Sequence, residues 1–197
     1  MPELRSALAT PLRAGRFGAS AGDPGVVLSE RPLGTLIQIA GWRDSFEPAV
    51  GAVLQRLGFP GVGGFDRAQV AGDALAFRCA PERVLLRLAS PAVWAGVSAG
   101  LDQALTPVLD LSHSRTVLSL AGANVADLLA RVLPIDCDGA EFPVDRFVQS
   151  ALHSVGVLVH RRAAGFEIYV PRSFAVAIWE VLTENAGPFG YRVDGPT

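Results

Sequence analysis

The segment Asp110–Arg115 groups more side chains able to do chemistry than any other short stretch, with an aspartate, two serines, a histidine and an arginine. Aspartate, serine and histidine are the components of a hydrolase triad, but triad members converge from separate parts of a chain. Neighbours on one extended segment point alternately to opposite faces. We therefore expect no nucleophilic relay here. Asp110 or Ser112 should instead bond the backbone at a turn, and Arg115 should pair with a carboxylate.

Two further segments suggest chemistry that their spacing does not support. Phe59–Phe65 is rich in glycine, but it lacks the G-x-G-x-x-G spacing and there is no lysine for a phosphate loop. We interpret it as a hairpin or surface loop. Asp136–Asp138 could be combined into a metal site with a histidine, yet no ligand pairs occur at the spacing of structural sites. The histidines that could complete such a site are His113, His153 and His160. We interpret Asp136–Asp138 instead as a polar loop.

The segment His160–Arg162 lies where a predicted strand meets its turn. We interpret it as a solvated strand end, whose arginines could pair with a carboxylate on a partner. No G-x-S-x-G elbow is present to hold a nucleophile. The sequence therefore predicts no catalytic, cofactor-binding or metal-ligating residue in this chain.

The composition narrows the function classes further. A net charge of −2 over 197 residues argues against nucleic acid as a partner, because nucleic-acid binding needs a basic patch. All 17 basic residues are arginine, which excludes a lysine Schiff base or a Ser-Lys pair. Half of the residues are hydrophobic and 18% are charged, so the chain either buries a large core or keeps apolar surface for a partner.

The cysteines and the lengths of the apolar segments indicate the cellular compartment of the protein. Cys79 and Cys137 form no C-x-x-C pair and are interpreted as free thiols in a reducing cytoplasm. No run reaches the ~18 apolar residues of a membrane span. Arginines interrupt the N-terminal region, which argues against a signal peptide. We expect a cytoplasmic protein with no membrane contact.

The elements that must position these side chains form a repeat. In the first half, strands are predicted at 33–40, 74–77 and 83–88, with a helix capped by Asp44 after the first strand and a second helix from Ser90 to about Leu105. In the second half, strands are predicted at 116–121, 154–160 and 166–170, with helices at 125–132 and 173–185. Ala40-Gly41 corresponds to Ala121-Gly122, and Trp94 corresponds to Trp179.

The predicted fold class is therefore α+β, with two pseudo-repeated β-α-β-β-α units and mostly antiparallel sheet. We predict an extended N-terminal arm at 1–30, a first unit at 31–107, a second unit at 108–193 and a tail at 194–197. The arm is rich in Ala, Gly, Ser and Pro and is expected to become ordered by docking on a neighbour.

At Asp110–Arg115 the sequence resembles a known family, the small gamma subunits of bacterial heterotetrameric sarcosine oxidase. The likeness continues through Val117–Gly122, Leu133–Asp136, Phe166–Phe174 and Trp179, and the first half adds Leu33–Ile39. The same order of elements resembles the folate-binding module of the aminomethyltransferases of glycine cleavage.

This resemblance implies a complex of alpha, beta, gamma and delta chains that oxidises sarcosine to glycine. It also implies transfer of the one-carbon unit to tetrahydrofolate and release of hydrogen peroxide. FAD, FMN, NAD and the working tetrahydrofolate site would belong to other subunits, and the gamma chain would be non-catalytic. Two alternatives stay open: a free-standing folate-binding protein related to aminomethyltransferases, and a pure assembly protein.

Overall fold

The computed structural model describes residues 6–18, 22–99 and 101–195, and the chain divides into two compact units. One unit is Leu33–His113. The other joins the N-terminal part of the chain, up to Pro32, with the part that begins at Ser114. Of the predicted arm and tail, residues 1–5, 19–21, 196 and 197 lie outside the described residues.

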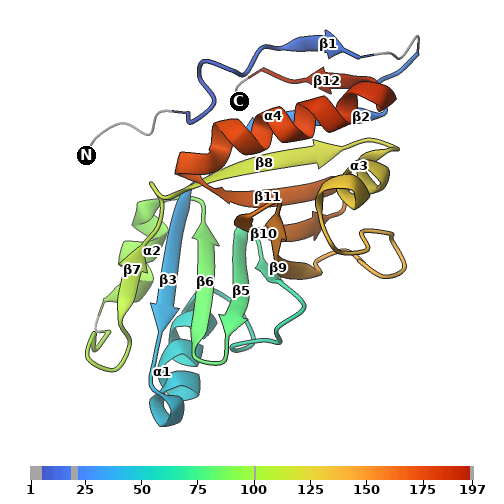
Figure 1. Cartoon of the computed structure of the whole chain (residues 1–197). Coiled ribbons are helices and arrows are strands. Elements are labelled where there is room, and N and C mark those ends of the chain that lie inside the picture. Colours follow the sequence, from blue (N-terminus) through green and yellow to red (C-terminus); the bar gives the residue numbers. More distant parts are fainter. Residues whose placement is uncertain (1–5, 19–21, 100, 196–197) are drawn as a thin grey trace. The chain divides into compact units, whose positions relative to one another are not determined.

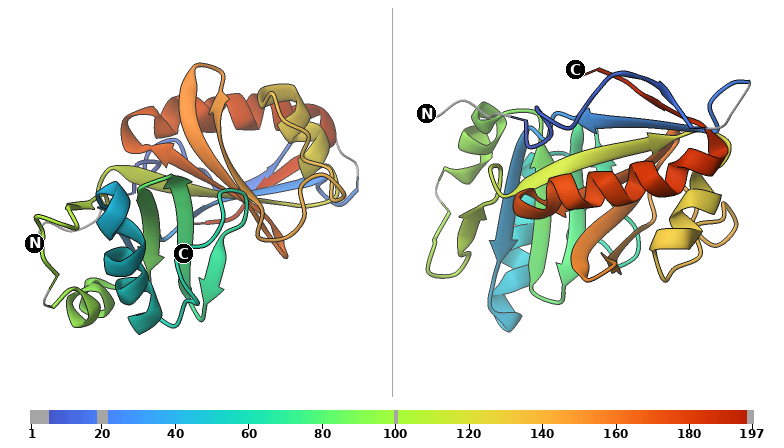
Figure 2. Two further views of the ribbon diagram at one scale, coloured as in Figure 1. Left: turned by 90° about the horizontal axis from the view of Figure 1, so that it is seen from below. Right: turned by 45° about the horizontal axis from the view of Figure 1, so that its top comes forward.

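The unit Leu33–His113 is a five-stranded antiparallel sheet in the order β4-β5-β6-β3-β7 (Figure 1). Helices α1 and α2 pack on one face of this sheet, as the left view of Figure 2 shows. The elements are β3 (Thr35–Ala40), α1 (Arg43–Arg56), β4 (Gln69–Ala71), β5 (Ala74–Ala80), β6 (Arg83–Leu88), α2 (Pro91–Ser98) and β7 (Val108–Asp110).

The other unit is a seven-stranded sheet in the order β1-β12-β2-β8-β11-β10-β9. Among the strand pairs that the structure describes in this sheet, only β12 with β2 is parallel. Helix α4 lies along this sheet in the right view of Figure 2. The elements are β1 (Gly15–Phe17), β2 (Val26–Arg31), β8 (Arg115–Ala121), α3 (Val125–Val132), β9 (Phe147–Leu152), β10 (Val155–Arg162), β11 (Gly165–Pro171), α4 (Ala175–Ala186) and β12 (Tyr191–Val193), with short 3-10 turns at Arg172–Phe174 and Gly187–Phe189.

The predicted repeat is present, and each copy contains one strand more than predicted. Both halves run β-α-β-β-β-α, because β4 and β9 precede the two predicted hairpin strands. The first strands of the two copies match residue by residue: Thr35 and Thr116 are both buried, and the burial pattern that follows is the same in β3 and β8. Helix α2 ends at Ser98, short of the predicted Leu105.

The structure corrects the predicted N-terminal arm and the predicted boundary at residue 108. Strand β2, within the predicted arm, lies inside the seven-stranded sheet between β12 and β8. Val26 and Leu28 are fully buried there. Strand β7, which was assigned to the second unit, pairs with β3 of the first. The strand that precedes each repeat therefore pairs into the sheet of the other repeat: β2 joins β8, and β7 joins β3. The sequence pattern of neighbouring residues does not reveal such an exchange.

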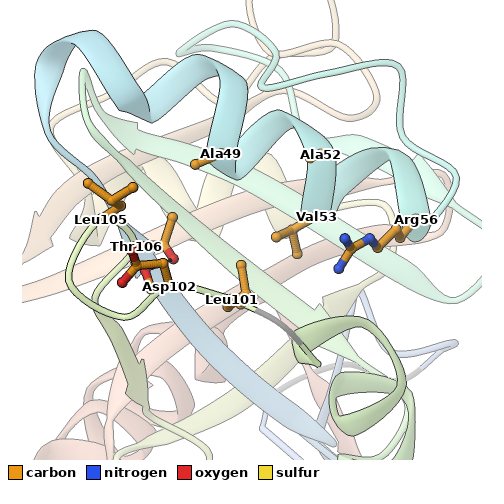
Figure 3. Close-up of a pocket in the computed structure, with 8 residues that line it drawn as sticks. All are labelled: Ala49, Ala52, Val53, Arg56, Leu101, Asp102, Leu105 and Thr106. Carbon is orange, nitrogen blue, oxygen red and sulfur yellow. Dashed lines mark hydrogen bonds between the residues drawn. The ribbon is translucent and has the colours of Figure 1, made fainter.

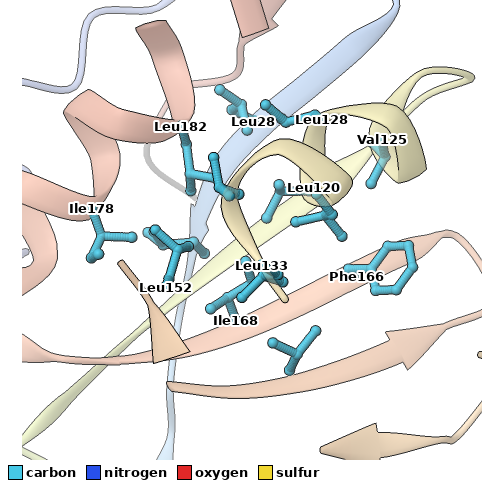
Figure 4. Close-up of a cluster of buried hydrophobic side chains, with 14 of the residues drawn as sticks. Leu28, Leu120, Val125, Leu128, Leu133, Leu152, Phe166, Ile168, Ile178 and Leu182 are labelled. Carbon is cyan, nitrogen blue, oxygen red and sulfur yellow. The ribbon is translucent and has the colours of Figure 1, made fainter. Parts of the chain in front are cut away.

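Each unit has its own hydrophobic core. In the seven-stranded unit, side chains from the sheet interdigitate with those of α3 and α4, and Figure 4 shows Leu120, Ile168, Leu128 and Leu182 in this layer. In the five-stranded unit the core lies between the sheet and α1, around Phe46. The predicted cap Asp44 lies in the first turn of α1 instead, and Trp42 occupies the N-cap, where its side chain makes no capping bond to the helix.

No helix in the described part of the chain is long and apolar enough to cross a membrane.

Candidate functional site

The segment that begins at Asp110 forms a backbone-bonded turn, as predicted. Strand β7 ends at Asp110, whose Oδ1 accepts the amide hydrogen of Ser112 at 2.8 Å. The buried Ser112 Oγ in turn accepts the amide hydrogen of Leu36 at 3.0 Å. The carbonyl of Leu36 accepts the amide hydrogen of Leu111, as in a regular strand pair. The amide of Leu36, however, donates to the Ser112 side chain, in the place where a longer β7 would offer a backbone carbonyl. Asp110 and Ser112 thus act on the backbone.

The electrostatics of this turn agree with a structural role. The side-chain and backbone hydrogen bonds from Ser112 lower the pKa of the Asp110 carboxyl, and the charge of His113 lowers it further. The carboxylate is therefore held ionised as an acceptor and is not poised as a proton donor. The predicted ion pair of Arg115 is not found among the described residues. Its guanidinium donates to the carbonyl of Ser114 at 3.2 Å.

A buried group of titratable side chains lies elsewhere, on β10 and β11. His160 is fully buried, which corrects its interpretation as part of a solvated strand end. Its Nδ1 lies 3.9 Å from Glu167 Oε2, and its Nε2 lies 3.7 Å from Asp145 Oδ1. The hydroxyl of Tyr169 donates to the same Glu167 oxygen at 3.2 Å. The buried imidazole thus has a carboxylate near each ring nitrogen, one from the buried Glu167 and one from Asp145, whose side chain is 40% exposed.

Sequence reasoning missed this group. Glu167 lies within the apolar run Phe166–Val170, and a charged residue in an otherwise apolar strand is the signal that could have identified it. His160 lies opposite Glu167 on the facing strand, and the second carboxylate beside His160 comes from a loop residue, Asp145, at positive φ. Spacing along the chain gives no hint of either partner.

The metal hypothesis finds no support among the described residues, where no group of three or more His, Cys, Asp or Glu side chains could hold a metal ion. Asp136 Oδ1 accepts the amide hydrogen of Asp138 at 2.9 Å, as expected for a polar loop, and Cys137 is buried in the core. The segment Phe59–Phe65 forms neither helix nor strand, and its first residue, Phe59, is buried.

A small depression lies beside α1 in the five-stranded unit (Figure 3). Its volume is about 180 Å3, below the range of about 300–1,000 Å3 usual for small-molecule sites. Two charged residues, Arg56 and Asp102, line this depression. The Nη1 of Arg56 donates to the carbonyls of Val97 and Ala99. The Oδ1 of Asp102 accepts the amide hydrogen of Ala104. Arg56 thus bonds the end of α2 and the residue after it, and Asp102 bonds the segment that follows.

A wider, open depression of about 750 Å3 lies in the other unit, where β8 begins and β11 ends. Arg115 and Arg172 bring positive charge to it, together with three serines, Ser6, Ser114 and Ser173. Such a surface suits a carboxylate or another anion. None of the described residues that line it is a carboxylate, and a pterin site expects one to bind the pterin amino groups. Neither depression thus combines the size and the donor set expected of a folate site.

Comparison with known proteins agrees with this geometry. Residues 61–196 match the family model described as GCVT N-terminal domain. The fold is also similar to that of glycine cleavage system aminomethyltransferase T from Bartonella henselae, with a TM-score of 0.57 at 19% identity, over 87% of this chain and 48% of that one. Fold and matched model together define a protein of the aminomethyltransferase-like class.

Two further likenesses cover nearly the whole chain. It is 30% identical over 172 residues to sarcosine oxidase subunit gamma from Corynebacterium sp. (strain U-96), which is 87% of this chain and 84% of that protein. A chain of the heterotetrameric sarcosine oxidase from Corynebacterium sp. U-96, solved with pyrrole 2-carboxylate, superposes with a TM-score of 0.80 at 27% identity, over 94% of this chain and 95% of that one. The chain belongs to the family of sarcosine oxidase gamma subunits.

Proposed function

We propose that this chain is the non-catalytic gamma subunit of a heterotetrameric sarcosine oxidase. The observation that carries the proposal is the match to one chain of such an oxidase along almost its full length. The site geometry supports a non-catalytic role. Asp110 and Ser112 accept hydrogen bonds from backbone amides, and the buried His160 group lines neither of the two depressions described above.

The partners we propose are the alpha, beta and delta subunits, with FAD, FMN, NAD and tetrahydrofolate bound on those chains. The complex would oxidise sarcosine to glycine, transfer the one-carbon unit to tetrahydrofolate and release hydrogen peroxide in the cytoplasm. In this assignment the gamma chain contributes its folded surfaces to the assembly, and its own side chains do not contact the substrate.

Co-purification tests the assembly. The tagged chain, expressed in its native host, is expected to bring down three further subunits in equal amounts, identified by mass spectrometry. The purified assembly should form hydrogen peroxide from sarcosine. A chain that purifies alone, under conditions in which the other three subunits are present, would contradict the proposal.

A free-standing folate-binding protein is a second candidate, because the chain matches the GCVT N-terminal domain over residues 61–196. Titration of the isolated chain with tetrahydrofolate separates the two. The geometry of the two depressions leads us to expect no saturable binding by the isolated chain. Saturable binding that is lost on substitution of Arg115 or Arg172 would favour the second candidate.

A further inference from the structure

Strand β7 leaves one edge of the five-stranded sheet without a neighbouring strand among the described residues. The alternation of hydrogen bonds along the β3–β7 pair determines which groups face that edge. Pro107 and Leu111 both bond towards β3, through the bonds Ala40 N–H to Pro107 O and Leu111 N–H to Leu36 O. In an antiparallel pair, bonded and non-bonded pairs alternate, so Val108 and Asp110 direct their N–H and C=O groups away from β3.

The matching strand of the seven-stranded sheet, β2, has a neighbour on this side. Leu28 of β2 pairs with Leu120, as Val108 pairs with Ile39, so Leu28 and Val108 hold matching places in the two repeats. Strand β12 pairs with β2 in parallel, and the carbonyl of Leu28 accepts the amide hydrogen of Asp194 at 3.0 Å. The chain thus supplies a strand at one of two matching edges and leaves the other without one.

The surface beside β7 is apolar. Leu109, on the strand itself, is 53% exposed, and Leu105 shortly before it is 45% exposed. Trp42 is 63% exposed, and its indole N–H donates to the carbonyl of Ala104 at 2.9 Å, which fixes the ring on the segment that leads into β7. Exposed edges are usually protected by charged side chains or proline. Strand β7 carries an exposed charge at its end, Asp110, and follows Pro107, but an exposed leucine occupies its middle.

We propose that β7 accepts an extended segment of another oxidase subunit as a sixth strand, parallel to β7 as β12 is to β2. The inference rests on the proposed function. Backbone groups of Val108 and Asp110 would provide the hydrogen bonds, and Leu109 would pack beside apolar side chains of the added strand. The described strands nearest the two ends of the chain, β1 and β12, are already placed in the seven-stranded sheet, which favours an occupant from a different chain.

Substitutions at two edges of the same sheet test the proposal. Leu109→Lys places a charge on the open β7 edge, and Val70→Lys does the same on β4, the opposite edge strand, where Val70 is 47% exposed. Val108→Pro removes an outward N–H and leaves the bonds to β3 in place. In competition with the wild-type chain for the other three subunits, Leu109→Lys and Val108→Pro should reduce incorporation about tenfold or more, which corresponds to about 1.4 kcal/mol. Val70→Lys should be incorporated like the wild type.

Hydrogen exchange supplies a direct readout that does not depend on a variant. The amides of Val108 and Asp110 should become protected when the chain enters the oxidase, and the amide of Val70 should not. Wild-type assembly with equal incorporation of Leu109→Lys and no new protection at β7 would overturn the inference and leave the subunit role intact. If the wild-type chain does not assemble at all, the proposed function itself fails. An isolated chain that forms a dimer broken by Leu109→Lys would assign the edge to a second copy, which also overturns the proposal.

Discussion

The two sheets share one order of five strands but differ at one edge. The order β4-β5-β6-β3-β7 corresponds strand for strand to β9-β10-β11-β8-β2, and the second sheet then continues into β12 and β1. The shared part is built from the repeated sequence. The added part is built from the two ends of the chain, which belong to neither repeat. The difference shows that residues outside a repeat can pair with an edge strand in one copy and leave the matching strand of the other copy at the edge of its sheet.

The exchange of preceding strands produces a second difference. Strand β2 continues to Arg31, which pairs with Val117, whereas β7 stops at Asp110. At the place that matches Val117, Leu36 receives its bond from the Ser112 side chain. The Asp-Leu-Ser turn therefore ends one sheet where the other continues as regular strand. This explains why the most distinctive motif of the sequence has a structural role.

The largest expected effect comes from truncating the closed edge. Leu28→Ala should lower the free energy of unfolding by about 2–5 kcal/mol, because Leu28 is fully buried between sheet and helices. The matching change Val108→Ala should cost less in the isolated chain, since Val108 is only partly buried. Urea denaturation of both variants measures the difference. Equal losses would contradict the distinction between closed and open edges.

The sequence predicted the repeated elements well. Strands of continuous apolar residues, such as β3 and β8, and helix α4 with its regularly spaced core residues were identified, because burial on one or both faces leaves a periodic pattern. Strands β4 and β7 have only three residues each, too few for a period. Strand β2 was missed because glycine and polar residues precede it and its partners lie far along the chain.

The candidate site was predicted in part. The turn at Asp110 and Ser112 was identified because these residue types bond nearby backbone groups, which is a local property. The partner of Ser112 was not predictable, since Leu36 lies 76 residues away. The same limit applies to His160, whose neighbour Glu167 depends on strand register, and to Arg115, whose predicted carboxylate is not among the described residues.

The second prediction compares two glycines that the repeat places together, Gly41 and Gly122. Gly122 has φ of +114°, and a Cβ there would lie 2.4 Å from the carbonyl oxygen of Gly25, next to β2. At Gly41 a Cβ would lie 3.0 Å from the ring of Phe46. Gly122→Ala should therefore destabilise the chain by about 1–3 kcal/mol or more, and Gly41→Ala by less. Thermal unfolding followed by circular dichroism checks the order, and a larger loss for Gly41→Ala would refute it.

The third prediction concerns the side chain that ends the open sheet. Ser112→Ala should cost about 1–3 kcal/mol, because the buried amide of Leu36 would lose its acceptor. Ser173→Ala is the matched control, since Ser173 is exposed and should change stability by no more than about 0.5 kcal/mol. Denaturant midpoints measured side by side give the comparison. A Ser112→Ala variant as stable as the control would show that water or a rearranged turn replaces the hydroxyl.

The smallest effect at neutral pH is expected from the cysteines, one in each unit. Burial raises the pKa of Cys79 from 9.0 to about 11, against the opposing charge of Arg83. Burial also raises the pKa of Cys137 to about 11, with a further contribution from Asp136. The thiolate fraction of the folded chain near pH 8 should thus be roughly a hundredfold below that of the unfolded chain, and alkylation should be slow for both.

The consequence for stability has a definite sign. Because the folded chain holds these two protons more tightly than the unfolded chain, their contribution is complete below pH 9.0 and declines as the pH rises towards about 11. Thermal unfolding between pH 7 and pH 11 should therefore show a decline above pH 9 that is smaller in the double variant Cys79→Ala/Cys137→Ala. Cys137 is buried and Cys79 only partly so, hence Cys137 should react more slowly with a thiol reagent. A faster reaction of Cys137 would contradict this expectation. It would show that the core of the seven-stranded unit opens to the reagent more readily than the partly exposed position of Cys79 on β5.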